Sequence, residues 1–132
     1  MTLRTEKTQT KYDRQRNDRR KCGCYLCRAE PIRNYGYWKI ITNEYPYDKI
    51  AAKHHIVTLQ RHAPEQEMTE QERKEFEKVR QHLHRRYDMI FENTVRKKSI
   101  PGHHHVHAIT LKSNETPIHR HDTAPKRVAA DI

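Results

Sequence analysis

The sequence has little material for a conventional hydrophobic core. Of its 132 residues, 33% are apolar and an equal share is charged, with only two phenylalanines, one tryptophan and three glycines. No apolar run approaches the ~20 residues that a membrane-spanning helix needs, and residues 1–21 lack the apolar segment of a secretory signal. We therefore expect no membrane span and a cytoplasmic location. A chain of this length suits one domain, whose small core would benefit from a metal or covalent staple.

Cysteine is scarce and confined to one place. The only three cysteines, Cys22, Cys24 and Cys27, lie within six positions. An odd, clustered set without a signal peptide argues against a disulfide framework and favours metal binding. The two-residue spacing from Cys24 to Cys27 lets both thiolates turn onto one ion, although a pair of free or redox-active thiols is the alternative. Cys22 is one residue too close to Cys24 for that geometry, so we treat it as a spectator.

The charge is strongly positive, with a formal net charge of +10. Residues 1–28 carry nine Lys or Arg against three acids, a net of +6. A basic arm of this kind often contacts phosphates, which predicts nucleic-acid contact. A solvated tail without function is the other interpretation, and the two are compatible. We expect residues 1–20 to be a flexible tail, residues 21–112 the folded domain, and residues 113–132 a polar C-terminal tail.

The remaining pattern predicts an α+β domain. Four runs rich in β-branched, aromatic or apolar side chains predict strands: residues 37–42, 55–59, 89–93 and 105–111. Thr69 and Glu72 form the pattern of a capping box, so a helix should begin at Thr69. Apolar side chains follow it at helical spacing and predict the buried stripe of that helix: Phe76, Val79, Leu83 and Tyr87. We expect an antiparallel sheet covered by helices.

Histidines are concentrated in the run from residue 103 to residue 107. Alternate side chains of a strand share a face, so His103, His105 and His107 should point one way and His104 the other. Three neighbouring imidazoles on one face are unsuitable as core filling, because each needs a polar partner. The row predicts a metal site or a catalytic row, and His104 is expected to be a partly solvated polar residue.

Two further ligands are needed if Cys24 and Cys27 bind a metal. His62 lies just beyond the strand predicted at residues 55–59, and His103 begins the histidine row. Together these four side chains would complete a Cys₂His₂ tetrahedron, the ligand set of a structural zinc site.

The segment from His103 to Ile109 follows the pattern H-φ-H-φ-H-φ-φ, which resembles the signature of the histidine-triad (HIT) family. The one departure within it is His104, which is polar where the family prefers an apolar residue. Other segments resemble the family in the same order along the chain: the zinc knuckle at residues 24–27, two central strands at residues 43–47 and 54–62, and the turn at residues 99–102. The resemblance covers about two-thirds of the chain.

This resemblance implies an antiparallel HIT-like sheet with helices, usually in a homodimer. It implies a structural zinc ion bound by four side chains: Cys24, Cys27, His62 and His103. It makes His105 the nucleophile of a nucleotide hydrolase or nucleotidyltransferase that forms a covalent nucleotidyl-histidine. His107 would hydrogen-bond the phosphate or the leaving oxygen.

The resemblance also implies a set of contacts to the nucleotide substrate. Ser99 and Asn93 match positions that touch phosphate, and Asn43 matches a ribose or phosphate contact. His54 matches the upstream histidine beside the nucleotide, with His55 as the competing candidate. Thr110 and Leu111 stand where the family often has Pro-Arg, and residues 94–98 replace a glycine-rich loop, so the leaving group stays open.

Three alternatives remain. The first is a zinc-stabilised nucleic-acid-binding module that uses the basic arm and the aromatic side chains of residues 35–38. The second is a zinc hydrolase in which His103, His105 and His107 are the ligands. The third is a HIT-like enzyme acting on nucleotides attached to nucleic-acid ends, with the basic arm as an anchor.

Overall fold

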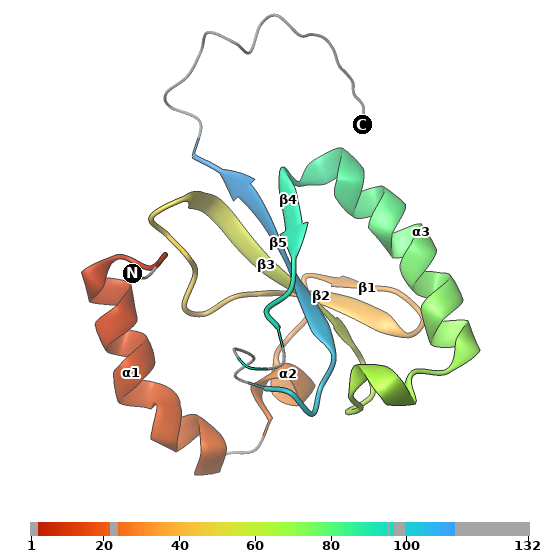
Figure 1. The fold of residues 1–132 in the computed structure, drawn as a ribbon, viewed down its shortest axis with the longest axis horizontal. Coiled ribbons are helices and arrows are strands. Elements are labelled where there is room, and N and C mark those ends of the chain that lie inside the picture. Colours follow the sequence, from red (N-terminus) through yellow and green to blue (C-terminus); the bar gives the residue numbers. More distant parts are fainter. Residues whose placement is uncertain (1–2, 22–23, 95, 97–99, 113–132) are drawn as a thin grey trace, which may run out of the picture.

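The computed structural model describes residues 3–21, 24–94, 96 and 100–112, and it shows an α+β fold (Figure 1). Within these residues, five strands form one sheet in the order β1-β2-β3-β5-β4, and every neighbouring pair is antiparallel. The strands are β1 (Arg33–Asn34), β2 (Trp38–Thr42), β3 (Ala51–Leu59), β4 (Met89–Phe91) and β5 (His105–Leu111). The helices are α1 (Glu6–Lys21), α2 (Tyr25–Arg28), the 3-10 helix η1 (Glu65–Glu67) and α3 (Glu70–Arg86). The expected α+β class with an antiparallel sheet is confirmed.

Helix α3 forms as its sequence predicts and covers one face of the sheet. Thr69 Oγ1 accepts a hydrogen bond from the Glu72 amide at 3.1 Å, and Glu72 Oε1 accepts one from the Thr69 amide at 2.8 Å. This capping box satisfies two amides at the helix start. Val79 and Leu83 are fully buried in a core cluster with Trp38 and residues of β3 and β5. The buried stripe of α3 is therefore confirmed.

The register of β3 and β5 assigns the histidines to the two faces of the sheet. His105 pairs with Thr58 and His107 with Ile56, so these side chains lie on the face away from α3. A second core cluster of Leu26, Ile41 and Ile56 packs on that same face beneath α2. Both faces are thus covered in part, and the histidine row lies on the face that α3 does not cover.

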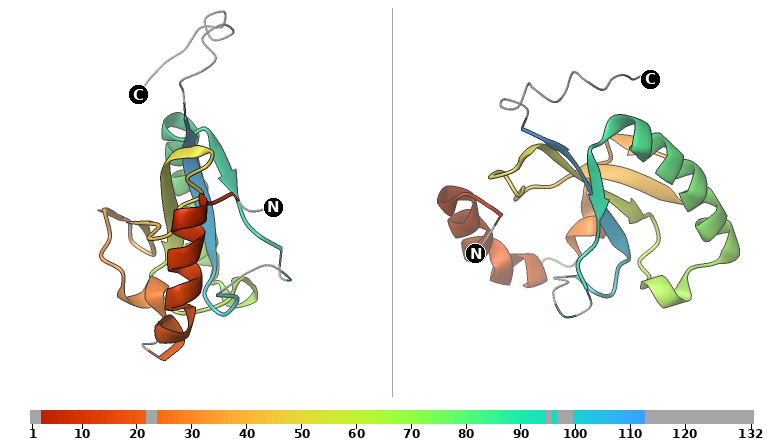
Figure 2. Two further views of the ribbon diagram at one scale, coloured as in Figure 1. Left: turned by 90° about the vertical axis from the view of Figure 1, so that its left-hand side faces the viewer. Right: turned by 45° about the horizontal axis from the view of Figure 1, so that its top comes forward.

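Helix α1 lies within the residues that the sequence predicts to be a tail, and its first turns contact the sheet domain. Its amino-terminal end is fixed by polar contacts, because Asp48 accepts hydrogen bonds from the Thr5 amide at 2.7 Å and from the Thr8 hydroxyl at 2.6 Å. Tyr12 also packs edge-on against Tyr45 at 5.7 Å between ring centroids. Figures 1 and 2 show α1 on the opposite side of the sheet from α3. A helix held by hydrogen bonds leaves no apolar periodicity in the sequence, which is why the pattern predicted a tail.

The structure does not describe every segment about which the sequence makes a prediction. The polar C-terminal tail predicted at residues 113–132 lies outside the described residues, as does Cys22. Within the described part of the chain, no helix combines the length and the apolar character that crossing a bilayer requires.

Candidate functional site

Four side chains from separate segments converge into a metal-binding cluster. The ligand atoms of Cys24, Cys27, His62 and His103 all lie within 4.8 Å of one another. His62 Nδ1 is 3.2 Å from His103 Nδ1, Cys27 Sγ is 3.2 Å from His62 Nδ1, and Cys24 Sγ is 3.4 Å from His103 Nδ1. Zinc bonds of about 2.3 Å to sulfur and 2.0–2.1 Å to nitrogen would place tetrahedral ligand atoms roughly 3.3–3.8 Å apart, with nitrogen–nitrogen pairs at the short end and the sulfur–sulfur pair at the long end. The sequence-predicted quartet is therefore assembled at a spacing that suits such an ion.

Local structure positions each member of this cluster. The carbonyl of Cys24 accepts hydrogen bonds from the Cys27 amide at 3.2 Å and the Arg28 amide at 3.3 Å, which turns the chain into α2 and brings both thiols together. His103 Nε2 lies 2.7 Å from the Leu59 carbonyl, and because a carbonyl only accepts, Nε2 carries the proton. The lone pair of His103 is then on Nδ1, which faces the cluster. A backbone acceptor on the far nitrogen is the usual outer partner of a metal-bound histidine.

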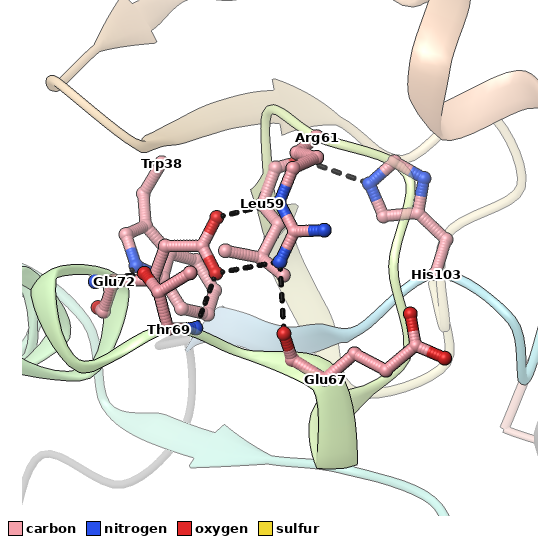
Figure 3. A network of polar contacts seen from close by, with 7 residues as sticks. All are labelled: Trp38, Leu59, Arg61, Glu67, Thr69, Glu72 and His103. Carbon is pink, nitrogen blue, oxygen red and sulfur yellow. Dashed lines mark hydrogen bonds and ion pairs between the residues drawn. The ribbon is translucent and has the colours of Figure 1, made fainter.

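A second network fixes the segment that carries His62 (Figure 3). Arg61 donates to both carboxylate oxygens of Glu72 at 3.0 Å and to the Glu67 carbonyl at 2.9 Å. The hydrogen bond from Arg61 is the main reason that the pKa of Glu72 lies below its usual value. The Glu72 carboxylate also belongs to the capping box of α3. The residue next to His62 is thus tied to the start of α3.

On the face of the sheet that α3 does not cover, the Tyr47 amide, His54 and His107 form a chain of hydrogen bonds, here called the histidine relay. The backbone partner determines which ring nitrogens carry the protons. His54 Nδ1 lies 3.0 Å from the Tyr47 amide, which can only donate, so His54 Nδ1 accepts and its Nε2 carries the proton. His54 Nε2 lies 2.8 Å from His107 Nδ1, which must then accept. The proton of neutral His107 is therefore on Nε2. The relay presents His107 as an N–H donor.

His105 has the opposite arrangement. Its Nδ1 lies 2.8 Å from the carbonyl of His103, so Nδ1 carries the proton and the lone pair is on Nε2. The His105 and His107 rings are 5.5 Å apart between centroids, on the same face of β5. One imidazole thus offers a nucleophilic nitrogen, and its neighbour offers a hydrogen-bond donor. Among the described residues, neither histidine belongs to a group of potential metal ligands, which disfavours the zinc hydrolase alternative.

Burial keeps the relay neutral. It lowers the pKa of His54 to about 4, with the positive charge of Arg4 as the next contribution. It also lowers the pKa of His107 to about 3, and the neighbouring His54 and His105 add to the shift. The His107 ring stacks on Phe91 at 5.0 Å between centroids and 8° between planes. At neutral pH both imidazoles are therefore uncharged and held in one tautomer each.

Three other residues were predicted to contact the nucleotide, and the structure describes two of them. The Asn43 amide nitrogen lies 3.2 Å from His54 Nε2, so this side chain packs against the relay. Asn93 Nδ2 lies 3.5 Å from the hydroxyl of Tyr47, whose ring stacks near His107. Both asparagines are thus at the site, whereas Ser99 lies outside the described residues.

Two histidines belong to the opposite face. His55 Nδ1 lies 2.6 Å from the hydroxyl of Tyr87 at the end of α3, so the structure favours His54 over His55 for the site. His104 is 6% exposed and packs edge-on against Trp38 at 5.7 Å. Its expected place on the far face is correct, but the expected partial solvation is wrong, because the core under α3 encloses it.

Sequence reasoning missed several residues of the site. Tyr47 supplies the amide that orients His54, and Phe91 supplies a stacking ring, but neither type of contact has a sequence signature. Arg4 was assigned to the tail, yet its guanidinium lies 4.9 Å from the centre of the Tyr47 ring. Residues 43–47, which the resemblance assigns to a central strand, lie instead in the connection between β2 and β3, and Asp48 belongs to the same connection.

Comparison of the chain with protein-family models, with curated proteins and with solved structures found no match in any of the three. The Cys₂His₂ cluster and the histidine relay are therefore the two features whose chemistry can indicate a function.

Proposed function

We propose that this protein is a nucleotide hydrolase or nucleotidyltransferase of the HIT kind, with His105 Nε2 as its nucleophile. The observation that carries the proposal is the pair of complementary tautomers on β5. The His103 carbonyl places the lone pair of His105 on Nε2, and the Tyr47–His54 relay places the proton of His107 on Nε2. A phosphorus atom attacked by one nitrogen would have a donor beside it for the departing oxygen.

The chemical steps follow from these proton positions. His105 Nε2 attacks the α-phosphorus of a nucleoside phosphate ester or anhydride, a P–N bond forms, and the bond to the leaving group breaks. The leaving group departs with the bonding electrons as an anion, which the Nε2–H of His107 stabilises by a hydrogen bond. His105 keeps its Nδ1 proton, so the nucleotidyl-imidazole carries a positive charge. Water or another acceptor then attacks the phosphorus, and the P–N bond breaks with its electrons returning to His105 Nε2. The proton that the acceptor loses passes to solvent, and neutral His105 is regenerated.

The proposed metal is a structural zinc ion bound by Cys24, Cys27, His62 and His103. Four protein ligands leave no open position for water, which is the pattern of a structural site. The ion would link the α2 knuckle to the start of β5. The link matters for chemistry because His103 contributes its imidazole to the cluster and its carbonyl to His105. The metal would thereby hold the nucleophile in its position and tautomer.

The test is a panel of adenylylated and guanylylated compounds with different leaving groups, assayed for release of the mononucleotide. Wild-type protein should release mononucleotide, and His105→Asn should lower the rate by several orders of magnitude, as loss of a covalent nucleophile does. His84→Asn, an exposed histidine on α3, is the matched control and should keep full activity. Metal content and thermal unfolding should be unchanged in both variants. Full activity in His105→Asn would refute the assignment.

A further inference from the structure

Helix α1 docks through one narrow polar stripe. Thr5 and Thr8 donate to Asp48, and Tyr12 packs on Tyr45. Burial alone would raise the pKa of Asp48, but the hydrogen bonds from Thr8 and Thr5 outweigh it and hold this pKa below its usual value. The carboxylate is therefore charged at neutral pH and able to fix the helix. The docked residues recur at spacings of three and four, so they occupy one side of α1.

A second stripe on α1 is basic and exposed. Lys7, Lys11 and Arg14 also recur at spacings of four and three, and all three side chains are exposed. At 3.6 residues per turn, this stripe lies about a third of a turn away from the docked stripe, and it extends for roughly 10 Å along the helix. Because the docked residues fix the rotation of α1, the basic stripe has a fixed direction relative to the sheet.

The basic stripe leads to the histidine relay through Arg4. Arg4 continues the same spacing toward the amino terminus, and its Nε donates to the Tyr45 carbonyl at 2.8 Å. Its guanidinium lies 4.1 Å from the centre of the Tyr12 ring and 4.9 Å from that of Tyr47. The Tyr47 ring in turn stacks near His107 at 5.8 Å. Arg4 thus lies between the relay and the amino-terminal end of α1, and the three exposed cations of the basic stripe follow it along the chain at the same spacing.

We propose that α1 binds the sugar–phosphate chain of a single-stranded nucleic acid whose terminal nucleotide occupies the His105 site. This inference rests on the proposed function and names the substrate class. A line of cations that starts at a nucleotide site suits a chain of phosphates continuing from that nucleotide. Anionic lipid fits less well, because a membrane-surface helix needs an apolar face and residues 4–14 contain no aliphatic side chain.

The test compares two substrates that carry the same adenylyl group. One is a short single-stranded oligonucleotide with adenylate joined to its terminal phosphate, and the other is a small adenylylated compound from the panel. The variant K7Q/K11Q/R14Q removes three exposed charges from α1. The matched control K74Q/K78Q/R85Q removes three exposed charges from α3, on the opposite side of the sheet.

The α1 variant should raise KM for the oligonucleotide by more than about tenfold at moderate salt, while the small substrate keeps its kcat and KM. With about 0.7 counterions released per phosphate contact, the slope of log KM against log salt should decrease by about 2. The α3 control should resemble wild type in both measurements. An oligonucleotide KM that the α1 variant does not change, or that both variants change equally, would overturn the inference and leave the proposed function standing.

Binding separates this inference from failure of the chemistry. Fluorescence anisotropy with an unadenylylated labelled oligonucleotide should show weaker binding by the α1 variant than by wild type and the α3 control. If wild-type protein cleaves neither substrate, the proposed function fails, while this measurement still decides whether α1 binds nucleic acid. Tighter binding to phosphatidylserine vesicles than to the oligonucleotide, lost in the α1 variant, would overturn the inference in favour of a lipid surface.

Discussion

The substitution His54→Gln tests the relay without touching either catalytic nitrogen. His54 Nε2 donates to His107 Nδ1 at 2.8 Å, and that bond fixes the His107 proton on Nε2. Glutamine cannot both accept from the Tyr47 amide and donate to His107 with the geometry of the ring. The buried His107 Nδ1 then lacks its donor, at a cost of ~1–3 kcal/mol, and the tautomer with the proton on Nδ1 becomes competitive.

The expected size of the kinetic effect follows from the role of His107. Loss of one donor that stabilises a developing oxyanion typically lowers kcat by 10²–10³, or about 2.7–4 kcal/mol. That loss should depend on the leaving group, because a weakly basic leaving group develops a charge that needs little stabilisation. We therefore expect a decrease of about 10²–10³ with an alkyl phosphoester and less than about tenfold with a p-nitrophenyl ester of the same nucleotide.

The assay is steady-state hydrolysis of these two esters by wild type, His54→Gln and the control His55→Gln. His55 is the next residue of β3 but faces α3, where its ring contacts Tyr87. The control therefore carries the same side-chain change on the opposite face and should preserve the ratio of the two rates. Equal losses on both esters in His54→Gln would refute the relay, because a general structural defect does not distinguish leaving groups.

Two further predictions concern the metal and acid stability. Purified protein should contain one zinc ion per chain. Cys27→Ser should lose the ion and unfold at a lower temperature, whereas Cys22→Ser should keep it, as measured by elemental analysis and thermal unfolding. Wild-type protein that contains no zinc and whose stability a chelator does not change would refute the prediction. Because the pKa values of His54 and His107 are about 4 and 3 against 6.5 in the unfolded chain, the unfolded state binds more protons between about pH 6.5 and 3. The free energy of unfolding should therefore fall as pH is lowered through that window, by up to about 1.4 kcal/mol per pH unit for each histidine. Urea unfolding at a series of pH values should show a shallower acid slope for His54→Gln, and an unchanged slope would contradict the shifted pKa values.

The parts of the fold that were predictable depend on short-range patterns. The capping box at Thr69 and the buried stripe of α3 follow from neighbouring residues, and the strand at residues 105–111 follows from its side-chain alternation. The four ligands could also be predicted, since Cys24 and Cys27 need two further donors and His62 and His103 lie at the ends of predicted strands. In these places local preference and tertiary packing favour the same answer.

The parts that were missed depend on contacts between distant segments. Helix α1 docks through hydroxyl and carboxylate groups, so its sequence resembles that of a solvated arm. The backbone amide of Tyr47 orients His54, and no residue type announces a backbone donor. Glu72 was interpreted only as a capping residue, although its carboxylate also anchors Arg61 beside the metal cluster. Contacts of this kind join residues that are distant in sequence, so they can be identified only from the three-dimensional structure.

Trapping the proposed covalent intermediate tests the role of His105 most directly. Wild-type protein mixed with an adenylylated substrate is quenched in acid-free denaturant within a single turnover and digested, and its peptides are sequenced by mass spectrometry. We expect an adenylyl group on His105, formed as fast as the leaving group is released and absent in His105→Asn. Adenylate on another residue, or turnover with no labelled protein at any time, would contradict the assignment of His105 as the nucleophile.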